Sequence, residues 1–589
     1  MVSRRNLATI FLMMLTIFFM FQFTQMVKFR NSRFDTNEYA TTPTQTAAGQ
    51  YYASMSDGYV IYIGDSSTSQ YKAVEKWCNN TKVYLVNKTS LNAAGQTILE
   101  EAEMIFVDGQ IDGADDPDKL EVITECNTPV VFVRMPDFDA VKSSRKMRKI
   151  LGIRKAKGEE IKALGLQFFD GFLIGGEAAY LPQKPEEEKY NDLELTSPWY
   201  ETGAGTEAYA VGMLDETEYK AEDFPRIIWR NTYNGTYVFA VSTDIINEEF
   251  GPGIISSIAY EAKDYYIYPV VNAQNVVLTD FPYVTNENQM EIQRIYSMNS
   301  QSLSRDIMWP AILSLATNDK LKLSCFLNPT RAYNQEEKVS KEYLEFYLKQ
   351  LQEVDGELGK SIHLDEEESL EEDIAASYDF YKCVPRYAYV SAYSDEIPVI
   401  LNEDELSMHT FICKEGDTEV AYLTENSTCQ KITNYADEYT YSKALKNRCL
   451  LNAIGYSNTL IDTSKVLNPQ GLEDEWQNFS KEVFGNIDTI YCSNDYFDFT
   501  ATGEADSRIR DYLNVKYDSV YEDGKVYLTV ENTDEAYFVF RVHNEAVKSV
   551  ENGEFKKLEK DTYLIHAYSG NCVISLKEAE EILHYQKPF

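Results

Sequence analysis

Four short apolar runs near the start of the chain restrict its fold more than any other feature. They cover residues 59–64, 82–87, 104–109 and 129–134, and each is nearly continuous in Val, Ile and aromatic residues. A strand with one exposed face alternates apolar and polar residues, so runs without alternation indicate strands buried on both faces of a parallel sheet. Helix-like stretches separate the runs. The pattern predicts a doubly wound α/β domain over residues 57–270.

Two further runs, 226–231 and 237–243, flank Tyr-Asn-Gly at 233–235, which is typical of a two-residue hairpin turn. Parallel units closed by a hairpin and by segment 250–261 resemble noncatalytic members of the class I glutamine amidotransferase-like fold. The first run ends in Gly-Asp-Ser-Ser at 64–67, and no G-x-G-x-x-G follows. We therefore expect a flavodoxin-like or amidotransferase-like domain with a binding or structural role.

Residues 275–282, Asn-Val-Val-Leu-Thr-Asp-Phe-Pro, predict a buried strand that ends on a single carboxylate, Asp280. A barrel presents polar groups at its mouth from such strand ends. After a helix-like segment come strand-like segments at 321–329 and 356–365. This order resembles the polysaccharide deacetylase (NodB-type) barrel, and we expect a (β/α) barrel, complete or incomplete, over residues 272–494.

The deacetylase resemblance implies a divalent metal held by one Asp and two His, with a second Asp as base. Here Asp280 is the one carboxylate of the first motif. Ser361 stands at the first ligand His, Asp365 stands near the second, and His363 lies between them. The late histidine motif falls at 467–471, which contains no His. We expect a barrel without metal chemistry, and therefore no metal and no cofactor.

The alternative is an active barrel in which Asp280, His363 and Asp365 are the catalytic residues. A divalent metal would then be required for deacetylase chemistry. Two carboxylates about 5 to 10 Å apart would instead support glycoside hydrolysis. The sequence leaves both forms of this alternative open.

Three further residues are candidate substrate-binding groups. Glu357 stands where the family has a Glu, and Tyr393 and Asp462 end strand-like runs at 385–393 and 455–462. Tyr suits sugar stacking, and it equally suits a half-buried sheet. For Tyr393 and Asp462 a capping or turn role is the alternative.

An apolar run at residues 7–26 is long enough to cross a bilayer as a helix of about 20 residues. It lacks a cleavage pattern of small residues and continues into basic residues, so we expect an uncleaved anchor within residues 1–36. Residues 37–56 are expected to be a flexible linker. We place the protein at the cell membrane as a single-pass protein with an external C-terminal body.

The chain is strongly acidic, with 94 Asp plus Glu against 55 Lys plus Arg and a net charge of -39. This charge excludes nucleic acid as a partner. High acidity either keeps an exposed protein soluble or attracts a cationic polymer such as a partly deacetylated amino-sugar polysaccharide. The acidic run 365–373 lies beside the candidate site.

Nine Cys occur without any CxxC motif. Cys413 and Cys429 flank two strand-like runs and are candidates to bridge a hairpin in an oxidising compartment. Cys78 and Cys126 are a second candidate pair. Isolated buried thiols are the alternative for all four.

The pattern changes to short alternating strands toward the C-terminus, at 525–532, 537–544 and 562–569, with turn residues between them. It predicts a β-sandwich over residues 506–577, either an accessory to the barrel or a contact for glycan.

The full order of anchor, amidotransferase-like domain, degenerate deacetylase barrel and β-sandwich resembles the DUF2194 family and PelA-type exopolysaccharide proteins. The resemblance implies a role in exopolysaccharide biosynthesis or export. Our leading hypothesis is a tethered pseudoenzyme that binds amino-sugar polymer. The alternatives are an active polysaccharide deacetylase or glycoside hydrolase, and a structural scaffold of a polysaccharide synthase complex.

Overall fold

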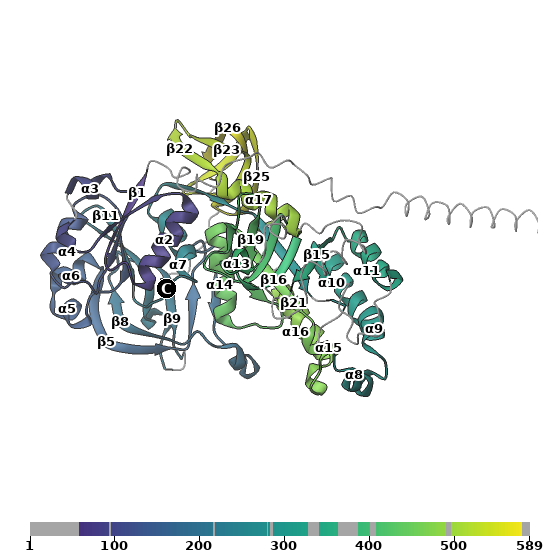
Figure 1. The fold of residues 1–589 in the computed structure, drawn as a ribbon. Helices are drawn as coiled ribbons and strands as arrows, with labels where there is room; N and C mark the ends of the chain where they lie inside the picture. The colour runs from purple at the N-terminus through teal and green to yellow at the C-terminus, as the bar shows by residue number, and fades with distance from the viewer. Residues whose placement is uncertain are drawn as a thin grey trace, which may run out of the picture. The chain divides into compact units, whose positions relative to one another are not determined.

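The computed structural model describes residues 58–93, 96–215, 218–279, 281–282, 287–327, 341–362, 387–400, 408–489 and 496–579. Four β-sheets and the helices between them form this part of the chain (Figure 1). No helix within these ranges is long and apolar enough to span a membrane. The predicted anchor and linker, residues 1–56, lie outside them.

The first sheet has the strand order β2-β1-β3-β4-β11-β10-β9-β6-β7. Its strands are β1 (Tyr59–Ile63), β2 (Tyr84–Lys88), β3 (Ile105–Asp108), β4 (Val130–Arg134), β6 (Gly165–Phe168), β7 (Ala178–Tyr180), β9 (Glu207–Met213), β10 (Arg226–Tyr233) and β11 (Thr236–Val241). The order β2-β1-β3-β4 is that of a doubly wound, flavodoxin-like sheet, and these strands pair in parallel as predicted. The remaining pairings, β10 with β9, β9 with β6 and β6 with β7, are antiparallel and were not expected.

Both faces of this sheet are covered. Its helices are α2 (Ser69–Thr81), α3 (Gln96–Glu101), α4 (Pro117–Thr124), α5 (Phe138–Ser143), α6 (Arg145–Ile150) and α7 (Gly251–Glu261), with 3₁₀ turns η1 (Leu91–Ala93), η2 (Pro185–Tyr190) and η3 (Ala221–Asp223). Val60 and Tyr62 belong to one buried cluster, while Ile61 and Ile63 belong to another. The absence of alternation in the sequence therefore reflects burial on both sides. A separate antiparallel pair, β5 (Ile153–Ala163) and β8 (Leu195–Thr202), completes this region.

The predicted hairpin joins β10 to β11. Asn234 and Gly235 have positive φ angles of 52° and 85°, which a two-residue turn of type I′ requires.

The second sheet is built from parallel strands and closes into a barrel. Its strands are β13 (Ala273–Thr279), β14 (Leu323–Leu327), β15 (Glu357–Ile362), β16 (Tyr387–Tyr393), β17 (Thr410–Glu415), β19 (Thr428–Lys431), β20 (Asn434–Tyr435) and β21 (Tyr456–Asp462), with β18 (Val420–Tyr422) antiparallel at β19. The Ile432 N–H donates to the Cys413 carbonyl, and the Thr433 N–H donates to the Asn458 carbonyl, both at 2.9 Å. Segment 428–435 thus pairs with β17 through its first half and with β21 through its second half, which closes the ring.

The helices of this region are α8 (Gln289–Tyr296), α9 (Ser300–Leu303), the π-helical turn η4 (Ser304–Met308), α10 (Trp309–Asn318), α11 (Lys341–Glu353), α13 (Ile397–Ile400), α14 (Tyr441–Ile454), α15 (Ser464–Leu467), the 3₁₀ turn η6 (Leu472–Asp474), α16 (Trp476–Ile487) and α17 (Thr502–Asn514). The helix expected at 303–318 is interrupted by the π turn just before Pro310, which has no N–H to donate.

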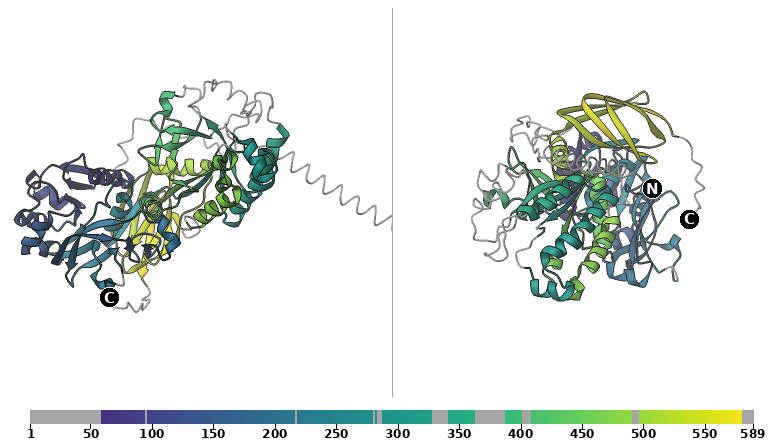
Figure 2. Two further views of the ribbon diagram at one scale, coloured as in Figure 1. Left: turned by 90° about the horizontal axis from the view of Figure 1, so that it is seen from below. Right: turned by 90° about the vertical axis from the view of Figure 1, so that its right-hand side faces the viewer.

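The C-terminal strands form one six-stranded antiparallel sheet: β12 (Tyr265–Val270), β22 (Lys516–Glu522), β23 (Lys525–Val542), β24 (Glu545–Glu551), β25 (Gly553–Glu559) and β26 (Thr562–Glu578). The long strands β23 and β26 are drawn in yellow in Figure 2. The runs predicted as two strands at 525–532 and 537–544 are one strand, β23, with an irregularity between Val530 and Glu535. Tyr265 pairs with the end of β23 and Tyr521 pairs with its start. Their ring centroids are only 5.9 Å apart, so the sheet folds on itself. A single sheet thus supplies both layers of the predicted sandwich.

Two buried arginines hold the loop at residues 171–176. Arg541 of β23 is 1% exposed and donates to the carbonyls of Gly171 and Phe172, the latter at 2.9 Å. Arg448 of α14 donates to the carbonyls of Leu173, Ile174 and Gly176. Guanidinium groups at these positions satisfy carbonyls that the loop itself leaves unpaired. The loop between β6 and β7 is thereby bound to the barrel and to the C-terminal sheet.

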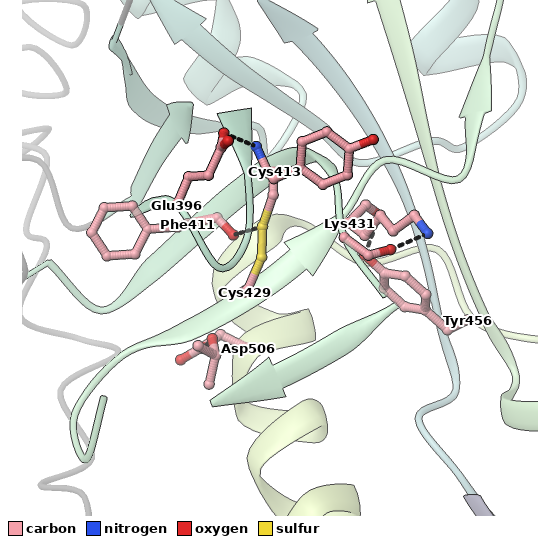
Figure 3. Close-up of a disulfide and its surroundings, with 10 residues drawn as sticks. Glu396, Phe411, Cys413, Cys429, Lys431, Tyr456 and Asp506 are labelled. Atoms are coloured by element: carbon pink, nitrogen blue, oxygen red, sulfur yellow. Dashed lines mark hydrogen bonds between the residues drawn. A yellow bond between two sulfur atoms is a disulfide. The ribbon is translucent and has the colours of Figure 1, made fainter. Parts of the chain in front are cut away.

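A disulfide joins Cys413 of β17 to Cys429 of β19, with a Cα–Cα distance of 6.4 Å (Figure 3). The predicted pairing is present, but it does not bridge a hairpin, because β17 and β19 are parallel neighbours. Cys78 and Cys126, the other suggested pair, are separate buried thiols.

Loss of the disulfide should destabilise the barrel. The bridge closes a loop of 16 residues, and the chain-entropy model gives about 3 kcal/mol for a loop of this size. We expect the double variant C413A/C429A to lose about this much unfolding free energy in urea denaturation. Dithiothreitol should lower the stability of the wild type and leave the double variant unchanged, which is the matched control. Recovery of the two cysteines on unlinked peptides from the unreduced protein would contradict the assignment.

Replacement of Arg541 by Met should lower the free energy of unfolding by more than the loss of one exposed charge would. The variant leaves the buried carbonyl of Phe172 and the partly buried carbonyl of Gly171 without donors, and a buried group of this kind costs about 1 to 3 kcal/mol, so we expect a loss of about 2 kcal/mol. Arg294→Met is the control, because Arg294 pairs with Glu291 on an exposed helix surface and should change stability by less than about 0.5 kcal/mol. Equal unfolding midpoints for the two variants would show that the loop is not held by Arg541.

Candidate functional site

The middle of the barrel is filled with apolar side chains. Residues from successive strands meet there in one buried cluster: Val277, Phe326, Tyr389, Ile412, Ile432 and Leu460. The barrel is therefore a packed core rather than a channel, and chemistry is confined to its two ends. Tyr389, one of the tyrosines of the sequence pattern, is a core residue.

The mouth, at the carboxyl ends of the strands, brings together several of the predicted residues. Asp462 ends β21 and lies opposite Thr279 of β13 in the parallel register. Tyr393 ends β16 and lies opposite Glu415 of β17. The strand ends thus place carboxylates and a tyrosine on one rim, as the barrel hypothesis requires.

The rim is strongly acidic. Tyr435 of β20 is half-buried within it, and burial together with the charges of Glu415, Glu438 and Asp462 raises the pKa of its hydroxyl to about 12. A hydrogen bond to Glu415 and its negative charge raise the pKa of Tyr393. Carboxylates of β17, of β21 and of the segment after β20 therefore all act on Tyr435. This concentration of negative charge favours a cationic ligand.

The individual roles of the two described rim residues differ. Tyr393 is 49% exposed and its ring is available to a ligand. Asp462 Oδ1 accepts a hydrogen bond from the Ser464 N–H at 2.9 Å, so this carboxylate also stabilises the turn into α15. The capping role foreseen for Asp462 is present and leaves its second oxygen, Oδ2, for other contacts.

Asp280, His363 and Asp365, the predicted catalytic residues, lie outside the described residues. Thr279 and Ile362, which precede Asp280 and His363, end β13 and β15 at the mouth. Among the residues described, no group of three or more His, Cys, Asp or Glu side chains is arranged to hold a metal ion.

Glu357 lies apart from the other candidates, at the opposite end of the barrel. It is the first residue of β15, whereas Tyr393 and Asp462 are the last residues of their strands. Its Oε2 accepts a hydrogen bond of 2.7 Å from the Gly503 N–H in the first turn of α17. A direct role beside Tyr393 and Asp462 is incompatible with this position.

Helix α17 closes the base of the barrel through a polar network. The Thr500 hydroxyl donates to Asn275 Oδ1 at 2.6 Å, and Asn275 Nδ2 donates to Gln430 Oε1 at 3.0 Å. The Thr502 N–H donates to Ser324 Oγ at 2.9 Å. Local sequence patterns do not indicate this network, because its partners are separated by more than a hundred residues. Polar residues inside otherwise apolar strands, such as Asn275 and Gln430, were the available signal.

The fold is similar to that of a solved carbohydrate deacetylase. The crystal structure of Agd3, described as a novel carbohydrate deacetylase, aligns with a TM-score of 0.50 and 9% identity over 88% of this chain and 98% of that chain. A putative polysaccharide deacetylase from Mycobacterium smegmatis aligns with a TM-score of 0.26 and 12% identity over 40% of this chain and 90% of its own. No curated protein matches the sequence.

The class defined by the fold is thus a mixed α/β protein with a deacetylase-like architecture. Residues 143–395 match the family described as "Uncharacterised protein conserved in bacteria (DUF2194)". This match confirms the DUF2194 relationship predicted from the sequence over that part of the chain.

The buried carboxyl at the barrel base should make stability depend on pH. Burial, reinforced by Glu504 and opposed by the Gly503 N–H, raises the pKa of Glu357 from about 4.5 to about 7. The folded state then binds more protons than the unfolded state between these values, so Glu357 lowers stability progressively as pH rises from 4.5 to 7. Above pH 7 the full effect is present, at most about 3 kcal/mol.

Glu357→Gln is expected to remove this contribution while keeping an oxygen acceptor for the Gly503 N–H. The variant should match the wild type near pH 4 and exceed it in unfolding free energy at pH 8, as measured by urea denaturation at both pH values. Glu125→Gln, at an exposed carboxyl, controls for the change of net charge. A wild-type advantage at pH 8 would refute the proposed linkage.

Proposed function

We propose that this protein binds a cell-surface amino-sugar polymer at the mouth of its barrel, and that it acts in exopolysaccharide biosynthesis or export. The observation that carries the proposal is the acidic, tyrosine-containing rim formed by Tyr393, Glu415, Tyr435 and Asp462. Free amines of a deacetylated amino sugar are positive and complement this rim. The apolar face of a pyranose ring suits the exposed ring of Tyr393.

The deacetylase-like fold supports a carbohydrate ligand, since Agd3 carries the description of a carbohydrate deacetylase. The chain's net charge of -39 favours a cationic polymer over an acidic one and opposes nucleic acid.

We also propose that the protein is tethered to the membrane and that its body lies outside the cytoplasm. The disulfide between Cys413 and Cys429 supports it, because such bonds persist in oxidising compartments. The apolar run at residues 7–26 supports a single-pass anchor. A polysaccharide synthase or export complex is the partner that this position would serve.

We propose binding without hydrolysis as the activity of the barrel. Ser361 stands where the deacetylase family has a metal-ligand His, and its hydroxyl instead donates to the Phe326 carbonyl at 3.1 Å. A hydroxyl committed in this way to the strand ladder does not replace an imidazole ligand. An active hydrolase using Asp280, His363 and Asp365 remains the competing function.

Incubation of the purified full-length protein with N-acetylated glucosamine oligomers, with and without zinc or cobalt, separates these functions. We expect no acetate release and no shortening of the oligomers under either condition. Metal-dependent acetate release would establish a deacetylase, and shortened oligomers would establish a glycoside hydrolase. The scaffold alternative is tested by a separate pull-down from membranes. Copurification of a glycosyltransferase without retention of glycan would favour it.

Neutralising the rim should weaken binding of deacetylated glucosamine oligomers. Asp462→Asn keeps an oxygen for the Ser464 N–H while removing the charge, so its effect should be electrostatic. We expect Asp462→Asn and Glu415→Gln each to raise Kd about 3-fold in calorimetric titrations at low salt, with a smaller effect at high salt. Glu125→Gln removes an equal charge elsewhere and should leave Kd unchanged. Equal effects of all three variants would argue against a site at the rim.

A further inference from the structure

A second cleft lies between the turn after α7 and the C-terminal sheet. It has a volume of about 790 Å³, and its walls come from α2, from residues 262–267 and from β22 and the start of β24. The cleft lies where the folded sheet brings the two ends of β23 together. Its shape is therefore set by sheet pairing rather than by mobile loops.

Aromatic rings form one wall of this cleft. Tyr521 of β22 is 44% exposed, and its ring centroid lies 5.9 Å from that of Tyr265 of β12 at an interplanar angle of 32°. The Tyr265 hydroxyl donates to the Ser519 carbonyl at 3.3 Å, which fixes this ring against β22. Two adjacent tyrosine rings with one fixed and one accessible are suited to stacking on a sugar ring.

Two buried polar groups on residues that line the cleft interact with each other. They are the indole N–H of Trp77 and the hydroxyl of Tyr266, on residues 3% and 7% exposed. The indole can only donate, so the Tyr266 oxygen is the acceptor. This pairing holds the two rings in place beside the cleft.

The carboxylates of the cleft exceed its cations. Glu103 forms an ion pair with Lys263 at 2.6 Å. Asp264, Asp518 and Glu545 also line the cleft and form no ion pair within the described residues, while Tyr521 donates to Glu545 at 3.3 Å. The uncompensated charge is negative, and it lies beside the aromatic wall.

We propose that this cleft is a second binding site for the cationic amino-sugar polymer, an inference that rests on the function proposed above. A pyranose ring stacks on Tyr521 and Tyr265, and its ammonium group faces Asp264, Asp518 and Glu545. The ring wall distinguishes this ligand from a cationic peptide, which would use the carboxylates alone.

Hydrogen–deuterium exchange of the full-length protein, with and without a deacetylated glucosamine tetramer, locates the binding sites separately. We expect slower exchange in peptides covering 262–267 and 517–522. Protection at 387–393 and 456–462 reports on the barrel mouth instead. Mouth protection without cleft protection would overturn this inference and leave the proposed function intact, and the reverse pattern would do the opposite.

Tyr521→Ala tests the stacking contact of the proposed site, and Glu545→Gln tests its charge contact. We expect Tyr521→Ala to reduce cleft protection and to weaken tetramer binding there about 5-fold or more, and Glu545→Gln to weaken it about 3-fold. Tyr527→Ala is the matched control, because Tyr527 is an exposed tyrosine of β23 that does not line the cleft. Equal protection of wild type and Tyr521→Ala, or equal cleft protection by tetralysine and by the glucosamine tetramer, would contradict a sugar site.

Discussion

The arrangement of the molecule depends on two arginines whose charges are buried. A guanidinium removed from water is costly unless its donors are satisfied. Both terminal nitrogens of Arg541, and Nε and Nη2 of Arg448, donate to carbonyls of the loop at 171–176. The Arg541 Nε alone has no partner within the described residues. Arg541 also lies over the ring of Tyr260, 3.9 Å from its centroid. One loop of the first sheet thereby binds a barrel helix and the C-terminal sheet at once. Separation of these sheets would break the hydrogen bonds and leave the guanidinium groups and the loop carbonyls without their partners.

The same use of buried polarity closes one end of the barrel. Helix α17 occupies the base, and its first turn satisfies Ser324 and Glu357 of the barrel strands. A ligand is consequently excluded from the base, and the acidic rim at the other end is the accessible surface. The base and the mouth have different chemistry: the base is formed by buried amides and hydroxyls, and the mouth by carboxylates with tyrosine.

Local sequence patterns predict most of the strands and the hairpin turn. They do not predict which distant strands pair with one another. The unbroken apolar runs and the turn at Asn234 determine strand type and hairpin geometry through nearest neighbours, and these predictions are confirmed. Nothing local distinguishes β12 as a strand of the C-terminal sheet, because its partner β23 lies more than 250 residues further along the chain. The family motif gave the position of Glu357 along the chain but not the end of the barrel at which it lies, which follows from its place as the first residue of β15. The rim residues Tyr393 and Asp462 were predictable because each ends a recognisable strand.

The two proposed acidic sites would have a consequence for a polymeric ligand that neither has alone. An exposed rim carboxylate contributes at most about 1 kcal/mol, so a single sugar unit would be bound weakly at either place. A chain that contacts both sites converts the second contact into an intramolecular event, and affinity then rises with polymer length up to the span between the sites. Each single contact would still dissociate rapidly, because it is weak. A protein that guides a growing polysaccharide requires this combination of retention of the whole chain and release of each unit.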